Sequence, residues 1–253
     1  MFSRVRRCVG RWQGGFTLIE LLTVLAIIFL LLGILMPVLK PVREMSRRTV
    51  CLCNLRVLAD DMLAYSASWR LRIPLSYQTG CKQFNYGLVE RFKPFGGFGA
   101  MYESGHLMNA RNYYCPSMEH DYFQYDTAIN PWPQDQINHR RTRMGYGARP
   151  MVCWQAKAHA SKVPTEIPRV DLMGPGHAIV ADIFSTPEVL DVCHIDRINV
   201  AWIDGSAAWV DRKVLGAAWE ENCRFGYVTA NNPIMLDESS DPATGAWANL
   251  DRN

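Results

Sequence analysis

A long apolar run near the N-terminus is the feature that most constrains this chain. From Phe16 to Met36 there are 21 consecutive residues, and only four of them are not strongly apolar. As an α-helix the run would be about 30 Å long, which matches the hydrocarbon thickness of a bilayer. A secretory signal peptide fits less well, because its shorter apolar region would be followed by a small-residue cleavage site. We therefore expect a helix that spans the membrane.

One carboxylate, Glu20, lies near the start of this run. An unpaired charge in hydrocarbon costs on the order of a few kcal/mol even on lenient insertion scales. Glu20 should therefore have a partner, and the sequence shows no basic residue close to it on the predicted helix.

Charge excludes one class of partner. The 15 residues ahead of Phe16 contain four arginines and no acid, and the rest of the chain has 23 basic and 24 acidic residues. Nucleic-acid binding requires a concentrated basic surface, so no nucleic-acid partner is expected. Basic residues also follow the apolar run, and counting charge does not fix its orientation in the membrane.

The string Gly15-Phe16-Thr-Leu-Ile-Glu20, followed by an apolar helix, resembles the class III signal of type IV pilins and of type II secretion pseudopilins. This resemblance implies that residues 1–15 are a leader peptide. A prepilin peptidase would cleave after Gly15 on the cytoplasmic side of the inner membrane and methylate the new N-terminus at Phe16. It also implies that Glu20 of one subunit pairs with the Phe16 amine of a neighbouring pseudopilin subunit in a filament. The alternative is a single-span anchor whose glutamate reaches toward the interface.

Gly33 and Pro37 are expected to weaken the apolar helix near its end. Proline removes a backbone hydrogen bond and invites a kink, and pilin-like helices often have proline or glycine at this depth. The sequence does not decide between a kink at Pro37 and the end of the helix there.

A second helical pattern follows the membrane half, residues 16–36, and extends over residues 42–70. Its apolar stripe repeats every three or four residues, as in a half-buried helix. The stripe consists of Leu52, Leu55, Ala59, Met62, Ser66 and Trp69, with Leu58 and Tyr65 beside it. The resemblance implies one long helix over residues 16–70 and an α+β head over residues 71–253. The head would lie outside the cytoplasm and contain a small antiparallel sheet.

The clearest strand signal is the segment 197–212, which has Asp204-Gly205 at its centre. Such a pair favours a two-residue hairpin turn. This turn predicts that Trp202 lies opposite Ala207 and that Val200 lies opposite Trp209 on one apolar face.

The same hairpin carries a second resemblance. His194, nine intervening residues and then Asp204-Gly205 match the H-X9-DG pattern of a group of pilin-like exported proteins. The segments 102–107 and 113–117 also resemble stretches that are common in that group. One histidine and one acid fall short of a metal ligand set. We expect Asp204 to shape the turn and His194 to form a hydrogen bond within the sheet.

Seven cysteines remain if Cys8 leaves with the leader, and disulfides are permitted outside the cytoplasm. Cys81 with Cys115 and Cys193 with Cys223 are two candidate pairs, whereas Cys51 and Cys53 should lie on different helix faces. A zinc site is an alternative, and its donors would be Cys51, Cys53, Cys115 and His120. The acidic tail offers weak calcium ligands, which are Asp237, Glu238 and Asp241, although a solvated loop is the preferred interpretation.

No familiar enzyme motif occurs in the sequence, so no catalytic residue and no cofactor are expected. The favoured function is a structural, pseudopilin-like subunit of a pilus-like filament. The alternative is a membrane-tethered surface protein whose head binds a ligand, such as a polysaccharide, through exposed tryptophans such as Trp132 or Trp154.

Overall fold

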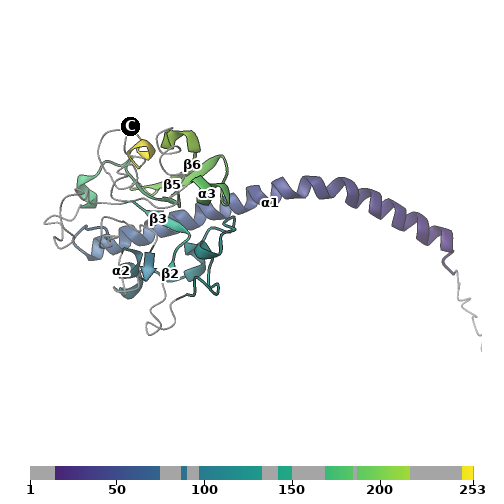
Figure 1. Cartoon of the computed structure of the whole chain (residues 1–253), viewed down its shortest axis with the longest axis horizontal. Coiled ribbons are helices and arrows are strands. Elements are labelled where there is room, and N and C mark those ends of the chain that lie inside the picture. Colours follow the sequence, from purple (N-terminus) through teal and green to yellow (C-terminus); the bar gives the residue numbers. More distant parts are fainter. Residues whose placement is uncertain are drawn as a thin grey trace, which may run out of the picture. The chain divides into compact units, whose positions relative to one another are not determined.

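The computed structural model describes residues 15–74, 87–89, 97–132, 142–149, 169–184, 187–216 and 247–252. The chain divides into two compact units, Met1–Met45 and Ser46–Asn253. The α-helices and strands, labelled in part in Figure 1, are α1 (Leu18–Ser68), β1 (Gly87–Val89), α2 (Phe98–Glu103), β2 (Thr142–Arg143), β3 (Tyr146–Ala148), β4 (Ala178–Asp182), α3 (Pro187–Asp191), β5 (Arg197–Trp202) and β6 (Ala207–Asp211). This is the expected α+β class, with an apolar N-terminal helix and antiparallel sheets.

The helix α1 does not end at Pro37. Both Pro37 and Pro41 lie inside its bounds. Each proline lacks an amide hydrogen, so the helix continues past them with fewer backbone hydrogen bonds than a regular helix of this length.

In the second unit, α1 contributes the apolar face that the sequence predicts. Cys51, Leu55, Leu58, Ala59 and Met62 are completely buried. They pack in one cluster with side chains of the β-sheet, such as those of β3 and β4. This spacing at three and four residues is the reason why the segment forms a half-buried helix.

Trp69 departs from the predicted stripe, because its side chain is exposed. The helix ends at Ser68, and Arg70 and Leu71 then adopt positive φ angles of 56° and 62°. This turn redirects the chain, and the indole of Trp69 instead stacks on the ring of Tyr65. Ile73, two residues after the turn, is the next buried apolar side chain.

The main sheet has four strands in the order β3-β4-β5-β6, and all neighbours are antiparallel. One face packs on the cluster that contains α1. The other face packs on a second cluster to which the sheet contributes Ile198, Val200 and Trp202. The rest of the second cluster includes Phe184, Leu190, Leu215, Trp247 and Leu250. Because both faces are covered, every residue of β5 from Ile198 to Trp202 is buried, including the polar Asn199.

The predicted register of the β5–β6 hairpin is wrong by one residue. Val200 pairs with Ala208, and the amide of Trp202 donates to the carbonyl of Ser206. The loop therefore has three residues, and its last residue, Gly205, has a φ of 78°. A turn followed by a left-handed glycine is a common three-residue hairpin loop. A shift of one residue moves side chains to the opposite face, so Trp209 pairs with Asn199 and does not lie opposite Val200.

Candidate functional site

At the start of α1, Glu20 has a local hydrogen-bond partner in Thr17, which is neutral and lies just ahead of the helix. The Oε2 atom of Glu20 accepts hydrogen bonds from the backbone amide of Thr17 (2.9 Å) and from its hydroxyl (2.7 Å). The amide of Glu20 in turn donates to Oγ1 of Thr17 (3.3 Å). This reciprocal arrangement is a capping box, and it satisfies donors that a helix N-terminus leaves open. The Thr-x-x-Glu spacing was visible in the sequence.

The apolar segment that follows has no cover from the described parts of the chain. Leu18–Pro37 is long and apolar enough to cross a membrane, and none of it is buried. Phe16 and Gly15, which precede it, are also exposed. An exposed apolar surface of this size is unfavourable in water.

The second candidate site is a cluster of four buried side chains in the head: Cys115, Asp182, Cys193 and His194. Cys115 follows the short helix η1 (Ala110–Tyr113), Asp182 is the last residue of β4, and the other two lie between α3 and β5. One ligand atom from each lies within 4.8 Å of the others. His194 is the histidine of the H-X9-DG pattern, whereas Asp204 of the same pattern lies elsewhere, in the exposed hairpin loop.

Short local contacts hold these four residues together. The amides of Cys193 and His194 both donate to the carbonyl of Leu190 at the end of α3 (3.1 and 2.9 Å). The segment that contains Cys115 lies so close to Gly145 that a Cβ there would be 2.8 Å from the amide nitrogen of Cys115. Glycine at position 145 therefore permits this approach.

Asp182 is the electrostatic centre of the cluster. Its Oδ2 atom accepts hydrogen bonds from the backbone amide (2.6 Å) and the side-chain amide (2.9 Å) of Asn199, and it lies 3.9 Å from Nε2 of His194. Its Oδ1 atom is buried and has no hydrogen-bond partner among the described residues. Burial raises the pKa of Asp182, and the neighbouring His194 and Asn199 oppose this effect. A cation beside the carboxylate would offset the cost of its burial.

The structure gives Cys115 a partner that differs from the predicted one. Cys115 forms a disulfide with Cys51 of α1, with 5.1 Å between the Cα atoms, so the Cys81–Cys115 pair is wrong. The other candidate pair, Cys193–Cys223, includes a residue outside the described ranges. The Sγ atom of Cys193 lies 3.6 Å from that of Cys115. Cys51, Cys115 and Cys193 therefore lie together in the interior of the head. Their spacing along the sequence did not indicate this.

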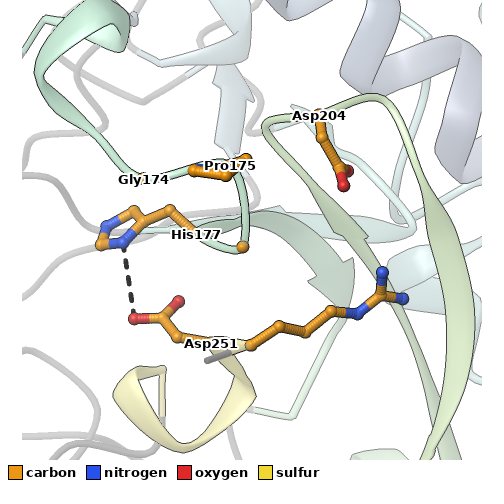
Figure 2. Close-up of a pocket in the computed structure, with 7 residues that line it drawn as sticks. Gly174, Pro175, His177, Asp204 and Asp251 are labelled. Carbon is orange, nitrogen blue, oxygen red and sulfur yellow. Dashed lines mark ion pairs between the residues drawn. The ribbon is translucent and has the colours of Figure 1, made fainter.

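A pocket of about 440 Å³ lies at the tip of the H-X9-DG hairpin. Figure 2 shows Asp204 on one side and His177 with Asp251 on the other, joined by an ion pair of 3.4 Å. Asp251 is held by Arg149 (2.5 Å), and the guanidinium of Arg252 lies over the ring of Trp202. The pocket therefore presents two carboxylates, an imidazole and a guanidinium to solvent.

Two pKa shifts in this pocket have local causes. Burial, together with the nearby Arg149 cation, lowers the pKa of His177, while Asp251 opposes the shift. Hydrogen bonds from the hydroxyl and the amide of Ser206 lower the pKa of Asp204. Asp204 accepts both of these hydrogen bonds within the hairpin loop. Asp204 is thus a charged residue that orders the turn.

The other predicted site residues that the structure describes join neither the buried cluster nor the pocket. Cys53 is exposed, and His120 accepts a hydrogen bond from the amide of Tyr122, so the zinc set with Cys51 and Cys115 does not form in this structure. Trp132 is partly buried and packs against tyrosine rings. The calcium candidates Asp237, Glu238 and Asp241, like Trp154, lie outside the described residues.

Sequence reasoning singled out His194 but missed Asp182 and Cys193 as members of one cluster. The adjacent Cys193-His194 pair was a weak signal in the sequence. Asp182 gave none, because a single acid at the end of an apolar strand does not indicate what lies beside it.

Comparison of this chain with models of protein families, with curated proteins and with solved structures found no match.

Proposed function

We propose that this chain is a pseudopilin-like structural subunit, processed by a prepilin peptidase and assembled into a pilus-like filament of a type II secretion or related system. The observation that carries the proposal is the uncovered apolar segment Leu18–Pro37, which starts beside the Gly15-Phe16 signal. A helix with this surface is stable in lipid before assembly and in a bundle of like helices afterward. In both environments its apolar side chains avoid water.

Glu20 has two partners in succession under this proposal. Before assembly, the Thr17 capping box holds its carboxylate within the same chain. Cleavage after Gly15 then creates an α-amino group on Phe16, and the amine of a neighbouring subunit pairs with Glu20 in the filament. A buried carboxylate is tolerated when a cation and hydrogen bonds accompany it, so this pair would select one axial register between subunits.

Processing is tested by the intact mass and the N-terminal peptide of the membrane-extracted protein, produced with and without a prepilin peptidase. The expected chain begins at N-methylated Phe16 only when the peptidase is present. Gly15→Val is the matched control, because no described atom lies within 4 Å of a Cβ at this position and the substitution therefore tests the peptidase alone. A chain that begins at Met1 under both conditions would contradict the proposal.

Assembly is tested with Glu20→Gln and Thr17→Val in a host that forms filaments from the wild-type chain. Thr17→Val removes the hydroxyl of the capping box but leaves the carboxylate for the Phe16 amine. We expect Glu20→Gln to be processed normally and to be absent from sheared filaments, whereas Thr17→Val assembles. Equal assembly of both variants would indicate that Glu20 only caps the helix and does not pair with a neighbouring subunit.

A membrane-tethered protein with a ligand-binding head is the second candidate function, and the pocket at the hairpin tip favours it. Its polar groups, Asp204, His177 and Arg252 among them, could accept and donate hydrogen bonds to sugar hydroxyls. This alternative predicts glycan affinity that Asp204→Ala weakens and Glu20→Gln leaves unchanged, which isothermal titration of the extracted chain would measure.

A further inference from the structure

We propose that Cys115, Asp182, Cys193 and His194 bind a Zn²⁺ ion in the interior of the head when the Cys51–Cys115 disulfide is reduced. The proposal concerns the head alone and does not depend on filament assembly.

The spacing of the donor atoms fits one tetrahedral ion. Sulfur ligands at about 2.3 Å and nitrogen or oxygen ligands at about 2.0–2.2 Å from Zn²⁺ are separated from one another by roughly 3.3–3.8 Å. The observed separations are 3.6 Å between the two sulfur atoms of Cys115 and Cys193, 3.3 Å from the Cys115 sulfur to Nε2 of His194, and 3.9 Å from that nitrogen to Oδ2 of Asp182. Two of these three separations lie within that range, the third is slightly longer, and all four donor atoms lie within 4.8 Å of one another.

The donor types suit zinc. Two thiolates, an imidazole and a carboxylate are the protein ligands that Zn²⁺ uses, and four of them make a closed structural site. All four residues are buried, and the exposed fractions of Asp182 and His194 are 1% and 2%. The buried Oδ1 atom of Asp182, which has no hydrogen-bond partner among the described residues, indicates a carboxylate whose interactions are incomplete.

Asn199 completes the arrangement from the neighbouring strand. Its backbone and side-chain amides both donate to Oδ2 of Asp182, which fixes the orientation of the carboxylate. Hydrogen bonds to a ligand from outside the coordination shell commonly orient metal ligands in this way. The site is therefore built on strands β4 and β5 as well as on the turn that contains Cys193 and His194.

The disulfide and the metal exclude each other, because Cys115 cannot bond to Cys51 and to the ion as a thiolate at the same time. A dithiol reductant transfers two electrons and two protons to the disulfide, becomes a disulfide itself, and leaves thiols on Cys51 and Cys115. Zn²⁺ then displaces the protons of the Cys115 and Cys193 thiols. In the oxidised state Cys115 is linked to α1, and in the metal-bound state it is linked to β4 and to the turn before β5.

The competing interpretation is a metal-free interior in which packing and hydrogen bonds alone hold the four side chains together. The two interpretations differ in whether Cys193 and Asp182 contribute to metal affinity.

The test uses the full chain in detergent, reduced with dithiothreitol, stripped with EDTA and titrated with Co²⁺ as a spectroscopic probe for zinc. We expect the visible bands of tetrahedral Co²⁺ and a thiolate-to-Co²⁺ charge-transfer band, which one equivalent of Zn²⁺ abolishes. Cys193→Ser and Asp182→Asn should weaken binding at least tenfold, whereas Cys53→Ser, at an exposed cysteine, should not change it. Unchanged Co²⁺ spectra in Cys193→Ser, or an identical spectrum from the oxidised wild-type chain, would overturn the proposal.

A second measurement needs no variant and so does not depend on folding of the substituted chains. The reduced wild-type chain is alkylated with iodoacetamide with and without Zn²⁺, and each cysteine is followed by peptide mass spectrometry. Zn²⁺ should slow alkylation of Cys115 and Cys193 at least tenfold and leave Cys53 unaffected. Equal rates at Cys193 with and without Zn²⁺ would exclude the site.

Discussion

The hydroxyl of Tyr113 donates a hydrogen bond of 3.1 Å to Oδ2 of Asp61, and this bond ties the short helix η1 to α1 within the head. Partial burial raises the pKa of Asp61, and the Tyr113 hydrogen bond only partly offsets that effect. Burial, followed by the Asp61 charge, raises the pKa of Tyr113 in turn. Relative to the unfolded chain, the folded state is therefore more stable when the Asp61 carboxyl is protonated.

This relation predicts a pH dependence of stability. Because the pKa of Asp61 is higher in the folded state, the unfolded chain loses this proton first as pH rises above 3.8. The stabilising contribution of protonated Asp61 to the free energy of unfolding is thus fully present below pH 3.8. It is lost as the pH rises through the raised pKa of the folded state. We expect the difference between wild type and Asp61→Asn to shift in favour of the variant over this window. Chemical denaturation of both chains at a series of pH values measures this difference in the free energy of unfolding. A difference that does not vary with pH would contradict a raised pKa for Asp61.

Asn130 is predicted to be a stability determinant because its buried side chain bonds to three backbone groups. Its Nδ2 atom donates to the carbonyls of Gln124 and Arg143 (2.9 Å each), and its Oδ1 atom accepts from the amide of Arg143 (2.7 Å). Asn130→Ala leaves these groups without partners and should lower the free energy of unfolding by about 2–4 kcal/mol. Asn112→Ala, at a partly exposed position, is the control and should change it by less than about 0.5 kcal/mol.

Gly176 is predicted to require glycine. A Cβ at this position would overlap the carbonyl oxygen of Arg252 and lie 3.0 Å from its Cβ. The Gly176 carbonyl also accepts the Arg252 amide (2.9 Å), so Gly176→Ala should displace residues 247–252 and expose Trp247. Faster proteolysis near the C-terminus and a red-shifted tryptophan emission would report this change. Gly174→Ala is the matched control, because the described residues leave open space there; similar effects from both substitutions would contradict the steric argument.

The Cys51–Cys115 disulfide is predicted to stabilise the head through the unfolded state. The two cysteines are 64 residues apart, and closing a loop of this length in the unfolded chain corresponds to about 4 kcal/mol in the chain-entropy model. Reduction in the presence of EDTA should lower the free energy of unfolding by an amount of this order. In Cys51→Ala the reductant should have a much smaller effect, and Cys53→Ala should respond like wild type. A wild-type loss below about 1 kcal/mol would contradict the prediction.

Local sequence pattern determined much of the architecture. Three signals are local, because each is contained in one continuous stretch of chain. They are the apolar run near the N-terminus, the three- and four-residue spacing of Leu55, Ala59 and Met62, and the Asp204-Gly205 turn signal. These patterns sufficed for the apolar N-terminal helix, the half-buried face of α1 and an antiparallel hairpin, whereas the expected α+β class came from the family resemblance. The Thr17–Glu20 capping box belongs to the same group, since its signal is a spacing of three residues.

Tertiary structure decided where those elements meet. The hairpin register depended on whether Ile203 joined the loop, and the indole of Trp202 bonds to the carbonyl of Leu250, far along the chain. The burial of the stripe ended before Trp69 because the backbone turned at Arg70. The partner of Cys115 and the gathering of Asp182, Cys193 and His194 depend on packing α1 against a sheet. Chain segments that are far apart in sequence approach only after the core forms, and no local preference encodes their distances.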